Sequence, residues 1–325
     1  MNWNIRELKA RANALVSENR SAALNVVLLY SGVIAALTLG SSGLNLYLDS
    51  QIGTTGGLDG MGLRSILQTV QEILYYVNTY FSPFWSAGFL FAMIALVRSR
   101  APETRDLTEG FRRFFRVLGH MAFRFLLAVM LGIAAVNLGA VLFSMTDAGR
   151  EFAQAMAPLL EDPALIGADG MVNMELIPQE LVLSAGIPMT LMVLAIFGLM
   201  YAFLFYQFRL SLYLVMDQPI GAVQAHFLSM RLMRGHKWQM LKLDLSWWWY
   251  YALLVLISLV GYLDVLLSML SVPLPMDPTV MYFVTLALYC VLFVGLCLWK
   301  KCLVDASYVL AYESIAAPGE PENAE

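Results

Sequence analysis

Long stretches without a charged side chain are the feature that most limits what this chain can fold into. The first covers residues 22–48 and is longer than the roughly 20 residues that an α-helix needs to cross a bilayer. Five further apolar stretches follow, and the charged residues, 14% of the 325-residue chain, gather in the blocks between them. A soluble globular fold would mix the two kinds of residue more evenly. The sequence therefore predicts an all-α fold, a polytopic helical bundle in the membrane, and does not suggest nucleic acid as a partner.

We expect six transmembrane helices in a single integral membrane domain, residues 1–316, followed by a disordered tail at residues 317–325. An amphipathic helix at residues 63–81 precedes the second span, and Pro83 at the junction predicts a kink or joint there. The longest polar region, residues 144–186, is rich in Asp and Glu and is expected to form an acidic outer loop. The expected spans are residues 22–48, 84–97, 118–143, 187–215, 245–270 and 280–298.

The basic residues predict how the chain is oriented. If the N-terminus is cytoplasmic, every Lys and Arg except Arg64 and Arg150 falls on the cytoplasmic side. Positive side chains accumulate in the cytoplasmic loops of membrane proteins, so this asymmetry predicts six spans with both chain termini in the cytoplasm. Losing or adding one span would scramble the distribution.

Basic amphipathic helices are expected on the cytoplasmic side just before spans one, three and five. In the first, residues 3–19, Ile5, Leu8 and Ala12 lie on one helical face. The three helices begin roughly 100 to 115 residues apart, which suggests parallel hairpin repeats of the kind found in some transporters. The same pattern arises when hairpins acquire basic ends through the positive-inside rule alone. The sequence leaves both interpretations open.

Three sequence elements resemble a known family: RELKA at residues 6–10, DLTEGF at residues 106–111, and a longer motif within residues 213–246. On these elements the chain resembles the bacterial integral membrane family catalogued as domain of unknown function 975. The resemblance implies a multi-pass protein of the bacterial cytoplasmic membrane with no assigned chemistry. The chain departs from the family pattern at Trp247, Trp248 and Trp249, where a Phe-Ile-Gly-Trp run is expected. The matching positions of the longer motif are Tyr213, Asp217, Pro219, Ser229, Met233, Gly235, His236, Lys237 and Ser246.

Arg209 is the most unusual charged residue of the predicted spans. It lies inside the fourth span, roughly 10 Å from the cytoplasmic end at the helical rise per residue. A charge within the membrane is a functional hypothesis by default, and Asp244, at the inner mouth of span five, is a plausible partner. The simpler interpretation is that Arg209 snorkels to the inner interface or forms a structural pair with Asp244.

A second group of polar residues is expected near headgroup level between spans four and five: Arg231, Arg234, His236 and Lys237. Together with Arg209 and Asp244, these residues make up a candidate polar, anion-binding cluster for a lipid phosphate at the inner leaflet. The simpler interpretation, which we favour, is that the charges hold this loop inside and that Gly235 ends the helix.

Motifs that carry chemistry are missing from the sequence. It contains no HExxH, GxSxG, P-loop, GxGxxG or paired CxxC, and Cys290, Cys297 and Cys302 have no histidine at metal-ligand spacing. We therefore expect no catalytic residue, metal or cofactor. The sequence favours a non-enzymatic accessory or scaffold protein that binds lipid or a protein partner. The alternative is a small-solute transporter or channel, with a water-accessible cavity lined by Arg209, Asp244 and Asp264.

Overall fold

The computed structural model describes residues 4–54, 61–160, 178–269 and 277–316. All regular elements in these residues are helices and none is a strand, so the all-α prediction is confirmed. The chain divides into two compact units, one made of Met1–His120 with Arg209–Glu325 and the other of Met121–Phe208. The predicted tail, residues 317–325, lies outside the described residues, and the single domain over residues 1–316 stays a prediction.

The helices confirm a polytopic membrane protein. Five are long and apolar enough to cross a membrane, and a bent pair makes a sixth span when its two parts are counted together. The bent pair joins Lys237–Ser246 to Trp248–Val260 at an angle of 59°. The other five candidates are Arg20–Leu48, Thr79–Val97, Phe114–Ser144, Leu183–Asp217 and Thr279–Ala316.

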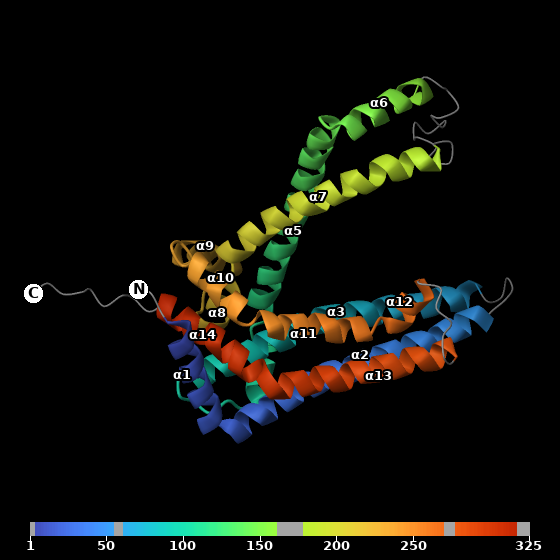
Figure 1. Cartoon of the computed structure of the whole chain (residues 1–325). Helices are drawn as coiled ribbons and strands as arrows, with labels where there is room; N and C mark the ends of the chain where they lie inside the picture. The colour runs from blue at the N-terminus through green and yellow to red at the C-terminus, as the bar shows by residue number, and fades with distance from the viewer. Residues whose placement is uncertain (1–3, 55–60, 161–177, 270–276, 317–325) are drawn as a thin grey trace, which may run out of the picture. The chain divides into compact units, whose positions relative to one another are not determined.

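The first unit contains most of the elements: α1 Ile5–Glu18, α2 Arg20–Thr54, α3 Met61–Val97, η2 Thr104–Thr108, α4 Glu109–Arg112, the start of α5 (Phe114–Ser144), α8 Ser211–Asp217, α9 Ala222–Leu232, α10 Lys237–Ser246, α11 Trp248–Val260, α12 Leu263–Met269, α13 Pro278–Leu296, the π-helical turn η4 Cys297–Lys301 and α14 Cys302–Ala316. Helices α2, α3, α11 and α13 run side by side, and α1 packs across α14 (Figure 1). Helix α3 continues through Pro83, so the predicted amphipathic helix and second span form one helix.

The second unit consists of the rest of α5 with α6 (Asp147–Leu160) and α7 (Gln179–Gln207). Gly139 of α5 lies so close to Val193 of α7 that an added Cβ would be 2.5 Å from its Cγ2. Helix α6 occupies part of the region expected to form the acidic outer loop, residues 144–186, so this region includes a helix; its place outside the membrane stays a prediction. Thr146 begins the helix, since its Oγ1 accepts from the Gly149 amide at 3.1 Å in the manner of an N-cap. Residues 161–177 lie outside the described residues.

Predicted spans four and five are not continuous helices. Helix α7 ends at Gln207, and a turn at residues 208–210 leads into α8, so Arg209 lies in a turn and not within a continuous helix as predicted. The fifth span bends at Trp247 and is interrupted again at Gly261. The sixth, predicted to end at residue 298, continues through η4 into α14.

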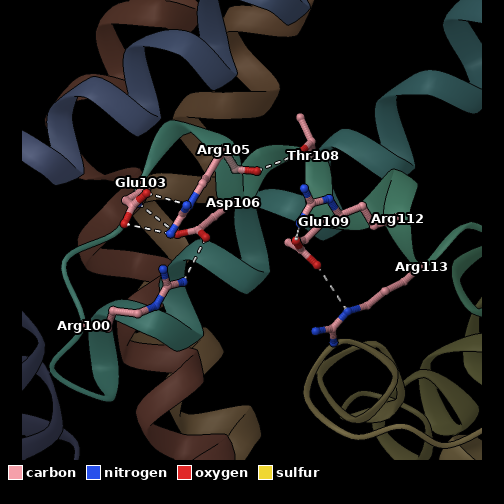
Figure 2. Close-up of polar contacts among 8 residues, drawn as sticks. All are labelled: Arg100, Glu103, Arg105, Asp106, Thr108, Glu109, Arg112 and Arg113. Carbon is pink, nitrogen blue, oxygen red and sulfur yellow. Dashed lines mark hydrogen bonds and ion pairs between the residues drawn. The ribbon is translucent and has the colours of Figure 1, made fainter.

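The segment formed by η2 and α4 packs closely on α3. An added Cβ at Gly88 would be 1.9 Å from the carbonyl oxygen of Leu107, and one at Gly110 would be 1.9 Å from that of Phe84. Asp106 is buried there; it pairs with Arg100 at 2.9 Å and accepts from the Glu103 amide at 2.9 Å (Figure 2). This packing explains why the DLTEGF element has a glycine and a carboxylate four residues apart.

Candidate functional site

The pair Arg209–Asp244 is the first part of the candidate site. Nη2 of Arg209 lies 2.6 Å from Oδ1 of Asp244 on α10, and the two side chains are only 13% and 18% exposed. Tyr308 on α14 donates its hydroxyl to the same oxygen at 2.5 Å and accepts from the Tyr251 hydroxyl at 2.9 Å. The Tyr308 ring also lies 4.8 Å from Cζ of Arg209. Of the interpretations that the sequence left open, the structure shows the pair.

Asp217, the last residue of α8, is the centre of a second charged group. Arg98 donates from Nη1 to Oδ1 at 2.6 Å and from Nη2 to Oδ2 at 2.8 Å. Tyr312 of α14 donates to Oδ2 at 2.8 Å, and Nε of Arg98 donates to Glu313 at 2.8 Å. The hydrogen bond to Asp217 raises the pKa of the Arg98 guanidinium, against the opposing effect of burial. This group ties the end of α3 to α8 and α14.

Lys301 and Asp305 form a third charged group, which sequence reasoning missed. Nζ of Lys301, in the π turn η4, lies 3.0 Å from Oδ2 of Asp305. The same ammonium lies 4.9 Å and 4.8 Å from the ring centroids of Tyr30 and Phe89. Aromatic faces attract a cation, so the ammonium is held from three sides. The spacing of Lys and Asp at i and i+4 was the signal that could have found the pair.

Helix α14 connects the three groups. Asp305, Tyr308 and Tyr312 stand at i, i+3 and i+7, so they share one helix face, and each belongs to one of the groups. We call this face the polar seam of α14. Ionisable side chains in a membrane span are costly unless they are paired, and each carboxylate of these groups has a cationic partner.

Two helix breaks are closed by side chains that come from elsewhere in the chain. At the break before α8, the Leu210 amide donates to Oγ of the buried Ser229, at 3.1 Å. At the bend between α10 and α11, Nζ of Lys9 donates to the Ser246 carbonyl at 2.8 Å and lies 3.7 Å from the Trp247 ring centroid. Burial lowers the pKa of the Lys9 ammonium. Backbone groups freed by a break in a span need such partners.

The remaining motif positions also have structural surroundings. The Tyr213 ring packs against that of Tyr312 with centroids 5.4 Å apart, Met233 is fully buried, and Pro219 follows the end of α8. Gly235 has φ +90°, in the left-handed region that glycine adopts without strain, and it lies in the turn between α9, which ends at Leu232, and α10. The motif therefore describes how α8, α9 and α10 fit together.

The predicted cluster is not gathered around one cavity. Arg231 and Arg234 are exposed at the end of α9. His236 Nδ1 lies 3.2 Å from Oε1 of Gln239, and Lys237 begins α10. Of the six residues of the cluster, Arg231 lines a groove between α5 and α9, and the other five line neither that groove nor the two other cavities given below for the described residues. The side chain of Asp264 lies outside the described residues.

Among the described residues of the first unit, the cavities of ligand size include the following three. An open groove of about 770 Å³ runs between the start of α5 and α9, and a pocket of about 340 Å³ lies between α1, α2 and η4. A third, of about 420 Å³, lies between α2, α11 and α13, and its lining residues include Tyr262, Tyr282 and Tyr289. Beside the groove, the buried rings of His120 and His226 stack with centroids 4.8 Å apart.

The described residues contain no group of three His, Cys, Asp or Glu that could hold a metal ion. The ionisable groups that do converge are saturated by one another, as in the pair Arg209–Asp244. What the first unit offers to other molecules is therefore its cavities and basic surface.

A family model described as a protein of unknown function, DUF975, matches residues 60–315, which is most of the chain. The match includes the DLTEGF element and the motif within residues 213–246, and it begins after the RELKA element at residues 6–10. No curated protein and no solved structure matches the chain.

Proposed function

The chain belongs to DUF975, a family of proteins of unknown function, and from this premise we propose a non-enzymatic accessory or scaffold protein of the bacterial cytoplasmic membrane. In this proposal its cytoplasmic face binds anionic lipid headgroups. The membrane-spanning helices support the location, and the one-sided distribution of Lys and Arg supports the orientation.

The observation that carries the proposal is the α5–α9 groove, which is lined by Phe115, Arg116, Val223, Phe227 and Arg231 among others. Its three large apolar residues are exposed, by 85% for Phe115, 54% for Val223 and 53% for Phe227. Guanidinium groups beside exposed apolar side chains suit the boundary between headgroups and acyl chains, where both kinds of group find partners. In water such a surface would be unfavourable.

Both chain termini are expected to be cytoplasmic, and cysteine labelling checks this. The three native cysteines are buried, so a cysteine introduced at an exposed position reports its own side of the membrane. In spheroplasts, a membrane-impermeant maleimide is expected to label Ala148→Cys of α6, and to label Glu18→Cys of α1 only after permeabilisation. Labelling of Glu18→Cys in intact spheroplasts would show that α1 lies outside the cytoplasm. The proposed binding of lipid headgroups of the inner leaflet would then lose its basis.

Lipid binding is tested on the full-length protein in detergent, by its melting temperature with phosphatidylglycerol or phosphatidylcholine added. A ligand that binds the folded state stabilises it. Phosphatidylglycerol is therefore expected to raise the melting temperature more than phosphatidylcholine does. Each basic residue near an anionic surface contributes about 1 kcal/mol, so Arg231→Glu is expected to reduce that difference by about half.

The matched control is Arg150→Glu, the same charge reversal on an exposed side chain of the second unit. It is expected to leave the difference between the two lipids unchanged. Equal stabilisation of the native protein by both lipids would refute the proposal.

A second candidate function, a small-solute transporter or channel, is favoured by the broken helices at residues 208–210 and at Trp247. Discontinuous spans are common at transporter binding sites. We place it second because Arg209 and Asp244 neutralise each other and line none of the cavities described. Labelling of Asp244→Cys by a water-soluble reagent in the folded protein would favour it.

A further inference from the structure

The pocket of about 340 Å³ is lined by two segments that are far apart in the sequence, residues 13–24 and residues 298–303. Helix α1 and the start of α2 form one wall, and η4 with the start of α14 forms the other. Its polar lining includes Asn13, Ser17, Arg20 and Lys300, and its apolar lining includes Leu24 and Trp299. None of the lining residues is a carboxylate.

Arg20 and Lys300 both line this pocket and bring two positive charges to it. Neither forms an ion pair with a residue in the parts of the chain that the structure describes, whereas the adjacent Lys301 has Asp305 at 3.0 Å. Two cations that converge from opposite ends of the chain on a cavity without carboxylates make it electropositive. The pocket therefore selects an anion.

The π turn η4 fixes the position of Lys300. Lys300 lines the pocket. The residue that follows it, Lys301, contacts Asp305 and the rings of Tyr30 and Phe89. Single π-helical turns inside α-helices occur often at functional sites. The contacts of Lys301 therefore fix the turn η4, which places Lys300 at the pocket.

The apolar lining indicates what kind of anion fits. Leu24 lies one helical turn into the first span, and the Trp299 side chain is 61% exposed beside the pocket. Tryptophan gathers at membrane interfaces, where its ring meets apolar chains and polar headgroups together. Ligand cavities have volumes of about 300–1,000 Å³, so this one holds a headgroup and leaves the acyl chains in the bilayer.

We propose that this pocket binds one anionic phospholipid, with its phosphodiester between Arg20 and Lys300 and its acyl chains beside Leu24 and Trp299. The inference rests on the proposed function, because it needs the inner leaflet to meet α1 and η4. This pocket is a second lipid site, separate from the α5–α9 groove.

The test counts lipids that the full-length protein retains in native mass spectrometry, with phosphatidylglycerol, phosphatidylcholine or inorganic phosphate added. The double variant Arg20→Gln, Lys300→Gln is expected to lose one phosphatidylglycerol, with at least a tenfold weaker apparent affinity at this site. Ser17→Trp, which fills the pocket and keeps both charges, is expected to lose the same lipid. Arg231→Glu, in the groove, is expected to retain it.

The outcomes separate this inference from the proposed function. Unchanged retention in both the double variant and Ser17→Trp would overturn the pocket, and the proposed function would stand if Arg231→Glu still weakened the response to phosphatidylglycerol. Displacement of the lipid by millimolar inorganic phosphate would identify a free-anion site and also overturn the inference. Equal retention of both lipids by the native protein would refute the proposed function itself.

Discussion

Replacing Asp244 with asparagine is expected to destabilise the protein by about 3–5 kcal/mol, the usual cost of removing one partner from a buried ion pair. Arg209 would stay charged with a side chain only 13% exposed, and the Tyr308 hydroxyl would lose a carboxylate acceptor at 2.5 Å. The measurement is unfolding by denaturant in detergent micelles, followed by tryptophan fluorescence.

Two further variants make this prediction specific to the pair. The double variant Arg209→Leu, Asp244→Leu is expected to recover most of the stability, because a buried pair can be replaced by apolar side chains at little cost. Asp147→Asn, which breaks an exposed pair with Arg150, is expected to leave stability unchanged. If Asp244→Asn lowered the free energy of unfolding no more than Asp147→Asn does, the pair Arg209–Asp244 would not contribute to stability.

The parts of the fold that depend on local sequence were predictable. A span needs a long apolar run, and that property can be read within one segment, so the membrane-spanning helices were identified correctly as a class. The partner of Arg209 was also within reach, because Asp244, at the inner mouth of span five, was the opposite charge expected near it. By contrast, Lys301 was counted only as a cytoplasmic charge, and its pair with Asp305 was not predicted although the i,i+4 spacing indicated it.

The helix breaks depended on contacts between distant residues. The Leu210 amide is satisfied by Ser229 and the Ser246 carbonyl by Lys9, which lies 237 residues away in the chain. A hydropathy pattern records the apolar side chains and not the backbone groups that a break exposes, so it predicts one continuous span. The pocket between Arg20 and Lys300 was missed for the same reason, since its two walls come from opposite ends of the chain.

Helix α6 shows the opposite case, a local signal that was overlooked. Thr146 is an N-cap residue, and Phe152 and Met156 of the following segment share one half-buried face of the helix. The acidic composition of residues 144–186 favoured a loop, yet charges on the exposed face of a helix give the same composition. Composition is therefore a weaker guide than the cap and the spacing.

Gly110→Ala is expected to destabilise the protein by at least about 3 kcal/mol, because the new Cβ meets backbone and not a flexible side chain. The carbonyl oxygen of Phe84 would be only 1.9 Å away. The short helix α4 would have to move off α3, and that movement would strain the contacts of the buried Asp106 with Arg100 and Glu103 (Figure 2). Gly88→Ala, which would meet the Leu107 carbonyl at 1.9 Å, is expected to have the same effect from the other side of the interface.

Gly32→Ala is the matched control, since nothing lies within 4 Å of the added Cβ at this position in α2. Alanine favours a helix over glycine by about 1 kcal/mol, so the control is expected to be neutral or slightly stabilising. Unfolding in detergent micelles compares the three variants under one condition. If Gly110→Ala and Gly32→Ala unfolded at the same denaturant concentration, the close approach of α4 to α3 would not exist in the folded protein, and the DLTEGF element would need another explanation.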